Sequence, residues 1–357
     1  MSSSSFDLLI AITFWLSIAL FACGVALMLF TLLLRRRNTE KRRRREDVLK
    51  AWHDIFTAAA EGEVRPALPL AASDALAVIG MWNDVRSSLR DGERRDARAL
   101  EDVARRAGLD KVALSYLERG DAAEKIAAAT TLGYLRDQRV LDRLDVLAAH
   151  GDGDVSFAAA RAMLSIEPAT AGIFLANLSL RRDWVPTRVE PVLTRFAEIV
   201  GPEFLFALEQ ADEEARVRLL GYAATLAPVI ARKAALGSLH HDAGTETIAA
   251  ALRALRPVVE PGDLPLLRTF VEHESPAVRV QVANALGALR GTEADELLQI
   301  LLRDGNPWVR QRAAEALAAG SGDPAAFLER ASSDRFAHQS LTFALEGSAA
   351  AAERGAV

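Results

Sequence analysis

The sequence of 357 residues is poor in cysteine, in aromatic residues and in lysine. Cys23 is the only cysteine, so no disulfide can form within the chain, which agrees with a reducing compartment. Aromatic residues amount to 6%, and no stretch alternates apolar and polar residues as a half-buried β-strand does. Only five of the 43 basic residues are lysine, and this Ala- and Arg-rich composition indicates a bacterium with a GC-rich genome. We therefore expect a bacterial protein built from helices.

The sequence also lacks the short motifs that carry common chemistry. It contains no Gly-x-x-x-x-Gly-Lys phosphate loop, no His-Glu-x-x-His and no Gly-x-Ser-x-Gly. The six histidines are scattered, and the adjacent His240 and His241 would point in two directions on a helix, which disfavours a shared metal. We predict no catalytic residues, no cofactor and no metal site, and hence a protein that is not an enzyme.

A long uncharged segment runs from Leu8 to Leu34, after a short tail over 1–7. It has 27 residues, whereas roughly 20 are enough to cross the hydrocarbon core of a bilayer. The segment is too long for the core of a signal peptide, and no Lys or Arg precedes it. We predict a single transmembrane helix over 8–34.

A basic juxtamembrane segment, 35–45, follows directly. Positive charge on one flank places that flank in the cytoplasm. We therefore predict a single-pass protein of the bacterial inner membrane, with its N-terminus outside and nearly all of the chain in the cytoplasm. The same side chains are also placed to contact anionic lipid, a compatible role worth about 1 kcal/mol per residue. The basic residues are Arg35, Arg36, Arg37, Lys41, Arg42, Arg43, Arg44 and Arg45.

The charge of the rest of the chain argues against nucleic acid as a partner. The net charge of the whole chain is −5, whereas residues 35–50 hold nine basic and three acidic groups and Asp7 adds one negative charge. Residues 51–357 therefore carry a net charge of about −10. Such a surface repels phosphate backbones.

Two segments, 264–289 and 295–320, repeat one another with a shift of 31 positions. Each contains an apolar helical stripe, a polar turn and a second stripe that begins at Pro276 or Pro307. Proline is tolerated in the first turn of a helix, so each segment predicts a helical hairpin. A lone hairpin cannot bury both stripes, whereas stacked copies bury them between neighbours.

The second helix of the hairpin opens with Pro276-Ala277-Val278-Arg279 and closes with Ala285-Leu286-Gly287. This pattern resembles the second helix of the HEAT-repeat family, in a short bacterial variety. It implies an all-α fold, a right-handed α-solenoid in which the second helices line the concave face and basic residues form ladders between repeats. The ladder residues implied are Lys125, Arg218, Arg279 and Arg310.

The same second-helix pattern recurs over 107–347 at intervals of 28 to 34 residues and predicts seven to eight hairpins. The register stays open by two or three residues in the copies near 189, 217 and 247. Residues 46–106 are predicted to be a helical lead-in that contains a proline-rich linker at 65–69, and 348–357 a frayed tail. Anchor positions are expected at Glu124, Val155, Val189, Val217, Thr247, Val278, Val309 and Ala337, and the repeat core at Val155, Val278, Val282, Leu286, Val309, Leu317 and Leu345.

These features favour a membrane-anchored, non-catalytic scaffold or adaptor that binds a membrane-associated protein. Trp184 and Trp308 lie beside prolines in predicted turns, where each would either pack over a repeat junction or contact a partner. The alternative is an anchored ligand-binding protein or lyase, similar to the bilin-lyase relatives of the family. A di-iron hydroxylase of the same family needs several His-Glu pairs, whereas this chain has only His273-Glu274.

Overall fold

The computed structural model describes residues 27–28, 30–31, 35, 44, 46–63, 65–89, 94–240, 242–320 and 323–355. All regular secondary structure within these residues is helical, which confirms the predicted all-α class for the described part. The predicted spanning segment, 8–34, lies outside the described residues apart from four of its last eight positions. Among the described helices, none combines the length and the apolar character that a membrane crossing requires. The chain divides into two compact units, Met1–Val140 and Leu141–Val357.

The first unit is built around two buried tryptophans. Trp52, in the helix over 46–60, and Trp82 lie in one apolar cluster, and Trp82 Nε1 donates a hydrogen bond of 3.0 Å to the carbonyl of Leu100. Residues 65–71, which include the predicted linker, are not helical. The other helices of this unit are α2 (Ala75–Ser88), α3 (Arg94–Arg106), α4 (Leu109–Arg119), α5 (Ala122–Leu135) and the 3-10 turn η1 (Gln138–Val140).

The hairpin that follows the predicted lead-in, 46–106, lies in the first compact unit. Helices α4 and α5 pack together and both contact α2, so this hairpin belongs to the first unit. The reason is a buried polar link: Asn83 Nδ2 donates to the carbonyl of Ala127 at 3.1 Å, and Thr131 Oγ1 donates to Asn83 Oδ1 at 3.0 Å. A buried amide needs such partners, which the lead-in pattern does not reveal.

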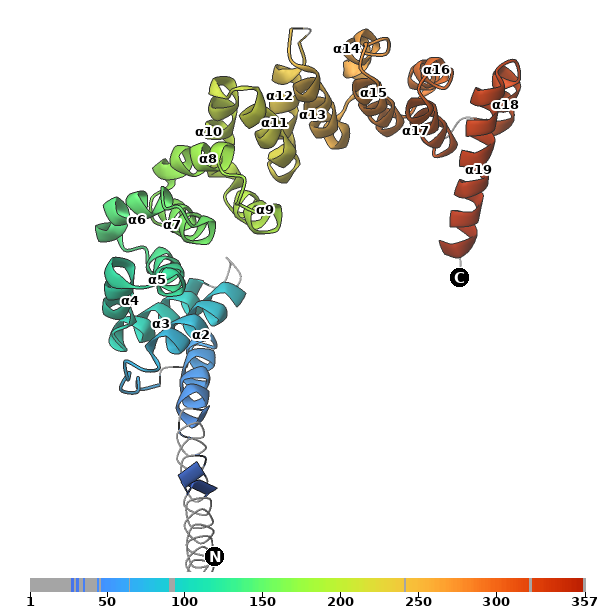
Figure 1. Cartoon of the computed structure of the whole chain (residues 1–357). Coiled ribbons are helices and arrows are strands. Elements are labelled where there is room, and N and C mark those ends of the chain that lie inside the picture. Colours follow the sequence, from blue (N-terminus) through green and yellow to red (C-terminus); the bar gives the residue numbers. More distant parts are fainter. Residues whose placement is uncertain are drawn as a thin grey trace, which may run out of the picture. The chain divides into compact units, whose positions relative to one another are not determined.

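The second unit consists of helices that follow one another in pairs, seven pairs within its described residues. The second helices of the last four pairs lie side by side, each packed on the next (Figure 1). Such stacking of hairpins is the arrangement of an α-solenoid. The helices are α6 (Leu141–Ala148), α7 (Gly153–Ile166), η2 (Pro168–Thr170), α8 (Ala171–Leu180), α9 (Pro186–Arg195), α10 (Ala197–Gln210), α11 (Glu213–Tyr222), η3 (Ala223–Thr225), α12 (Pro228–Ser238), α13 (Thr245–Leu255), η4 (Arg256–Val258), η5 (Pro261–Asp263), α14 (Leu264–Thr269), α15 (Pro276–Leu289), α16 (Thr292–Leu301), α17 (Pro307–Ala318), α18 (Pro324–Ala331) and α19 (Arg335–Gly355).

The starts of the second helices can be compared with the predicted anchor positions. Val155, Thr247, Val278 and Val309 are each the third residue of their helix, and each is buried. In α11 the third residue is Ala215, which is buried, so the assigned anchor two positions later is out of register.

The helix pattern also explains two differences at the C-terminal end. Helix α19 continues to Gly355, so the segment expected to be a frayed tail from 348 is helical to that residue. Leu345, assigned to the repeat core, is only half-buried. Helix α19 buries its apolar stripe at Ala337 and Leu341, one to two turns earlier, where it packs on α17 and α18. The other six predicted core residues are buried.

Candidate protein-interaction face

The turns between helices are held by arginines, and Arg279 makes the most complete set of contacts. Its Nη1 donates to the carbonyls of His273 and Glu274, at 2.7 and 2.9 Å, in the turn of its own hairpin. Its Nε and Nη2 donate to the two carboxylate oxygens of Asp304, at 2.6 and 2.9 Å, in the turn of the next hairpin. Arg279 therefore joins two successive repeats through a bidentate ion pair, the strongest form of charge-assisted hydrogen bonding.

Two opposing effects set the pKa of Asp304. Burial raises the pKa, whereas the hydrogen bonds from Arg279 and from the backbone N–H of Asn306 lower it. The hydrogen bonds prevail, and the pKa of Asp304 lies below its ordinary value. Asp304 is therefore a carboxylate at neutral pH, and it also accepts the Asn306 N–H at 2.8 Å at the start of α17.

The other predicted ladder residues differ in what they reach. Arg310 repeats half of the Arg279 pattern, since its Nη1 donates to the carbonyls of Asp304 and Gly305, and its guanidinium lies 5.2 Å above the ring of Phe336. Arg218 donates to the carbonyl of Ser179 in α8 at 2.7 Å and so links two hairpins. Lys125 lies half-buried on α5 of the first unit.

Sequence reasoning did not identify three arginines that also hold turns. Arg216 occupies the position in α11 that Arg279 has in α15, and its Nη2 donates to the carbonyl of Ala211. Arg181 binds carbonyl groups of the preceding hairpin together with the nearby Asp183, and Arg232 binds a carbonyl group and a carboxylate that follow α13. The bonds are Arg181 to the carbonyls of His150 and Gly151 and to Asp183, and Arg232 to the carbonyl of Val258 and to Asp263. The hydrogen bond from Arg181 lowers the pKa of Asp183.

Trp184 does not offer a surface to a partner. Its side chain is 4% exposed, and Nε1 donates a hydrogen bond of 2.9 Å to the buried Ser156 Oγ. Its ring stands edge-on to Phe157 at 5.2 Å and lies 5.3 Å from Phe174. Of the two alternatives for this residue, the structure therefore favours packing over the junction of α7 and α8.

Trp308 has the opposite environment, with 68% of its side chain exposed. It is the second residue of α17, and Phe336, 60% exposed, is the second residue of α19. Phe343, two turns later on α19, is 71% exposed. We use the name second-helix face for the exposed side of α13, α15, α17 and α19 that carries these aromatic residues.

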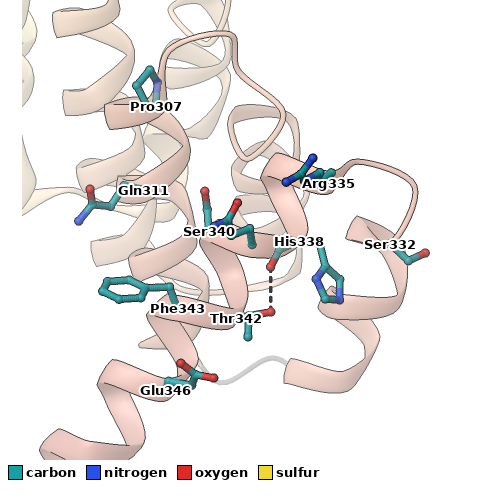
Figure 2. A pocket seen from close by; sticks show the side chains of 10 residues that line it. Pro307, Gln311, Ser332, Arg335, His338, Ser340, Thr342, Phe343 and Glu346 are labelled. Atoms are coloured by element: carbon teal, nitrogen blue, oxygen red, sulfur yellow. Dashed lines mark hydrogen bonds between the residues drawn. The ribbon is translucent and has the colours of Figure 1, made fainter.

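Two hollows flank α17 on this face. An open groove of about 950 Å³ borders α19, and Phe343 points in it to the same side as Gln311 of α17 (Figure 2). A smaller pocket of about 390 Å³ borders α15, and its charged lining consists of Arg256, Arg290, Arg312 and Glu315. Aromatic and arginine side chains are the residue types most enriched where proteins bind one another.

The predicted lipid-facing basic residues lie mostly outside the described part. Arg35 and Arg44 are described, and both are helical and exposed. Among the described residues, no group of three His, Cys, Asp or Glu side chains is arranged to hold a metal ion.

The comparison with protein families agrees with the stacked helical pairs. Residues 232–318, from α12 to α17, match the family model of HEAT repeats. No curated protein matches the chain. The match and the stacked helical pairs together support a HEAT-repeat helical protein.

Proposed function

We propose that this protein is a membrane-anchored, non-catalytic scaffold whose helical repeats bind another, membrane-associated protein. The observation that carries the proposal is the second-helix face, where Trp308, Phe336 and Phe343 are exposed. Of the five phenylalanine and tryptophan side chains exposed among the described residues, these three lie on two adjacent helices. Clustered exposed apolar side chains mark interaction sites rather than ordinary surface.

The anchor in this proposal is the uncharged segment 8–34, followed by the basic segment 35–45. Confinement at the inner membrane raises the effective concentration of the repeats toward a partner in the same membrane. We further propose that the solenoid is right-handed and cytoplasmic, with the N-terminus outside. A reporter active only in the periplasm, fused after Val357, should stay silent, and activity would refute this orientation.

The ligand-binding or lyase alternative would have to use one of the hollows beside α17. Small-molecule sites are concave, and they bury most of the ligand surface. The larger groove is open along its length and lined by polar side chains such as Gln311, Gln339 and Glu346, which suits an extended segment of a partner better.

The scaffold proposal is tested by purification of the tagged full-length protein after crosslinking in native membranes, with mass spectrometry of the proteins that accompany it. We expect one protein near stoichiometric amount, lost from a control chain that ends at residue 140 and retained by a control that changes only the exposed Arg268. Recovery of the same proteins with the truncated control, or of none above background, would refute the scaffold.

A further inference from the structure

The pocket between α15 and α17 has an excess of positive charge. Its lining contains Arg256, Arg290 and Arg312 against a single acid, Glu315. Arg312 is paired with that acid, at 2.6 Å between Nη1 and Oε2. Within the described part of the chain, the side chains of Arg256 and Arg290 have no hydrogen bond or ion pair. Two guanidinium groups therefore face this pocket without an internal acceptor.

A purely structural reason accounts for only part of this cluster. Arg256 and Arg290 follow the last residues of α13 and α15, where a positive charge is favourable beside the negative end of a helix. Arg312 lies in the middle of α17, where that effect is absent, yet its side chain lines the same pocket. Arg290 also has a φ of +51°, a conformation that costs a non-glycine residue backbone energy. The three positions share the pocket rather than a common place in their helices.

The excess of positive charge in this pocket contrasts with the negative charge of the rest of the chain. Residues 51–357 carry a net charge of about −10, so a pocket with three basic residues and one acid departs from the average surface. Arginine binds carboxylates through a planar, two-pronged geometry and is weakly hydrated, which suits an interface. Charge complementarity therefore points to an acidic ligand.

The groove on the other side of α17 indicates that the ligand also needs an apolar side chain. Trp308 lies one helical turn before Arg312 on the exposed side of α17, and Phe343 projects from α19 beside Gln311 (Figure 2). A ligand that crosses α17 from the pocket to the groove would meet arginines first and aromatic rings next. Such a ligand needs both carboxylates and a large apolar side chain.

We propose that the second-helix face binds an acidic segment of the partner protein, whose carboxylates pair with Arg256, Arg290 and Arg312 and whose apolar side chain packs on Trp308 and Phe343. This inference rests on the proposed scaffold function and names the chemistry of its partner. The arginines set orientation and association rate, and the aromatic side chains supply most of the affinity.

The test uses the full-length protein in nanodiscs of phosphatidylcholine, which bears no net charge and does not repel acidic peptides. A displayed library of random 12-residue peptides is selected on this protein. We expect the recovered peptides to be enriched in Asp and Glu together with Leu, Phe or Trp. Recovered peptides without acidic enrichment would overturn the proposal.

The matched variants are Arg290→Glu in the pocket and Arg268→Glu on the first-helix side, in α14, where the arginine is also exposed. A selected acidic peptide should bind the first variant at least tenfold more weakly and the second variant within twofold of the unchanged protein. Replacing the acidic residues of the peptide by lysine one at a time should identify one replacement that restores binding to Arg290→Glu, because Arg256 and Arg312 still need the other carboxylates. Arg290→Gln, which removes charge without reversing it, gives an intermediate loss if Arg290→Glu does not fold.

The outcomes separate the two proposals. If the crosslinked partner is recovered equally with Arg290→Glu and with the unchanged protein, and acidic peptides are not selected, the acidic segment is refuted while the scaffold stands. If neither a partner nor any peptide is recovered, both proposals fall.

Discussion

Replacing Asp304 by alanine tests whether its ion pair with Arg279, which we call the arginine clamp, stabilises the solenoid. The side chains of Arg279 and Asp304 are 16% and 9% exposed, so this pair is shielded from water. Removing one partner of a buried ion pair costs about 3–5 kcal/mol, because the other charge is left buried and unpaired. Arg279 keeps its two bonds to the carbonyls of His273 and Glu274 and some contact with water. We therefore expect a loss of roughly 2–4 kcal/mol, slightly below the range for a fully buried pair.

The loss should be local, since stability in a repeat protein is a sum of repeat and interface terms. Native-state hydrogen exchange of the full-length protein measures it at the amides of α15 and α17, which the clamp joins. Amides of α7, several hairpins away, should keep their protection. Equal loss of protection throughout the unit would show that the clamp acts globally and would contradict the reasoning.

The effect should also depend on pH in a defined direction. The folded-state pKa of Asp304 lies below its ordinary value of 3.8. A lowered pKa contributes stability that is present above the unfolded-state value and is lost as the pH falls through the folded-state value. The unchanged protein and Asp304→Ala should therefore converge in stability below pH 3.8. A difference that stays constant as the pH falls through 3.8 and below the folded-state pKa would show that lost packing, and not charge, accounts for it.

An exposed ion pair in α17, the helix that follows Asp304, provides a matched control. Arg312 and Glu315 are 49% and 40% exposed, and exposed pairs contribute less than about 1 kcal/mol. Arg312→Ala should therefore change the exchange of α17 amides little. If Asp304→Ala lowers the free energy of unfolding by less than about 1 kcal/mol at pH 7, the clamp contributes no more than this exposed pair, and its structural role is refuted.

Three further predictions concern packing and exposure. Gly287→Ala should lower the thermal unfolding temperature, because its new Cβ would lie 2.7 Å from the Cβ of Ala316. Gly80→Ala should raise that temperature, because its new Cβ would have nothing within 4 Å. Equal shifts of the two variants would contradict this reasoning. Leu317→Ala should cost about 2–5 kcal/mol in urea unfolding, as buried leucine truncations do, and an unchanged midpoint would refute burial. Trp308→Ala should leave unfolding within about 0.5 kcal/mol but reduce the yield of the crosslinked partner; retained yield would remove this residue from the interface.

The repeats were predictable where two copies share residues at fixed positions. Segments 264–289 and 295–320 align without gaps, because both second helices begin with proline and close with the same apolar stripe. Helix α11 begins with Glu213 after the capping residue Asp212, whose side chain accepts the N–H of Ala215. No proline marks this start, and the predicted anchor, Val217, lies two residues after Ala215. Helix α7 begins in the same way, after the capping Asp152, and there the third residue is a valine, whereas in α11 it is Ala215; the residue type at this position therefore accounts for the shift.

The contacts that hold the turns could not be predicted in the same way. Arg279 and Asp304 are 25 residues apart, and Arg181 and His150 are 31 apart. Whether such residues meet depends on how one hairpin stacks on the next. The burial of Trp184 has the same origin, since its acceptor Ser156 lies on a different hairpin. Sequence periodicity predicts which face of a helix is apolar, but it contains no information on partners across a repeat junction.

Arginine serves two purposes in this chain, and only the acceptors distinguish them. Arg279 and Arg310 occupy equivalent positions, and the Nη1 of each donates to two backbone carbonyls in the preceding turn, so both arginines hold turns. Arg256 and Arg290 lie at the other end of the second helices and have no acceptor within the described residues. A basic stripe drawn from sequence would have combined the two groups and assigned the binding surface to the turns. The proposed binding surface uses the second group, which lines the pocket between α15 and α17, and this is why the charge reversal tested is Arg290→Glu.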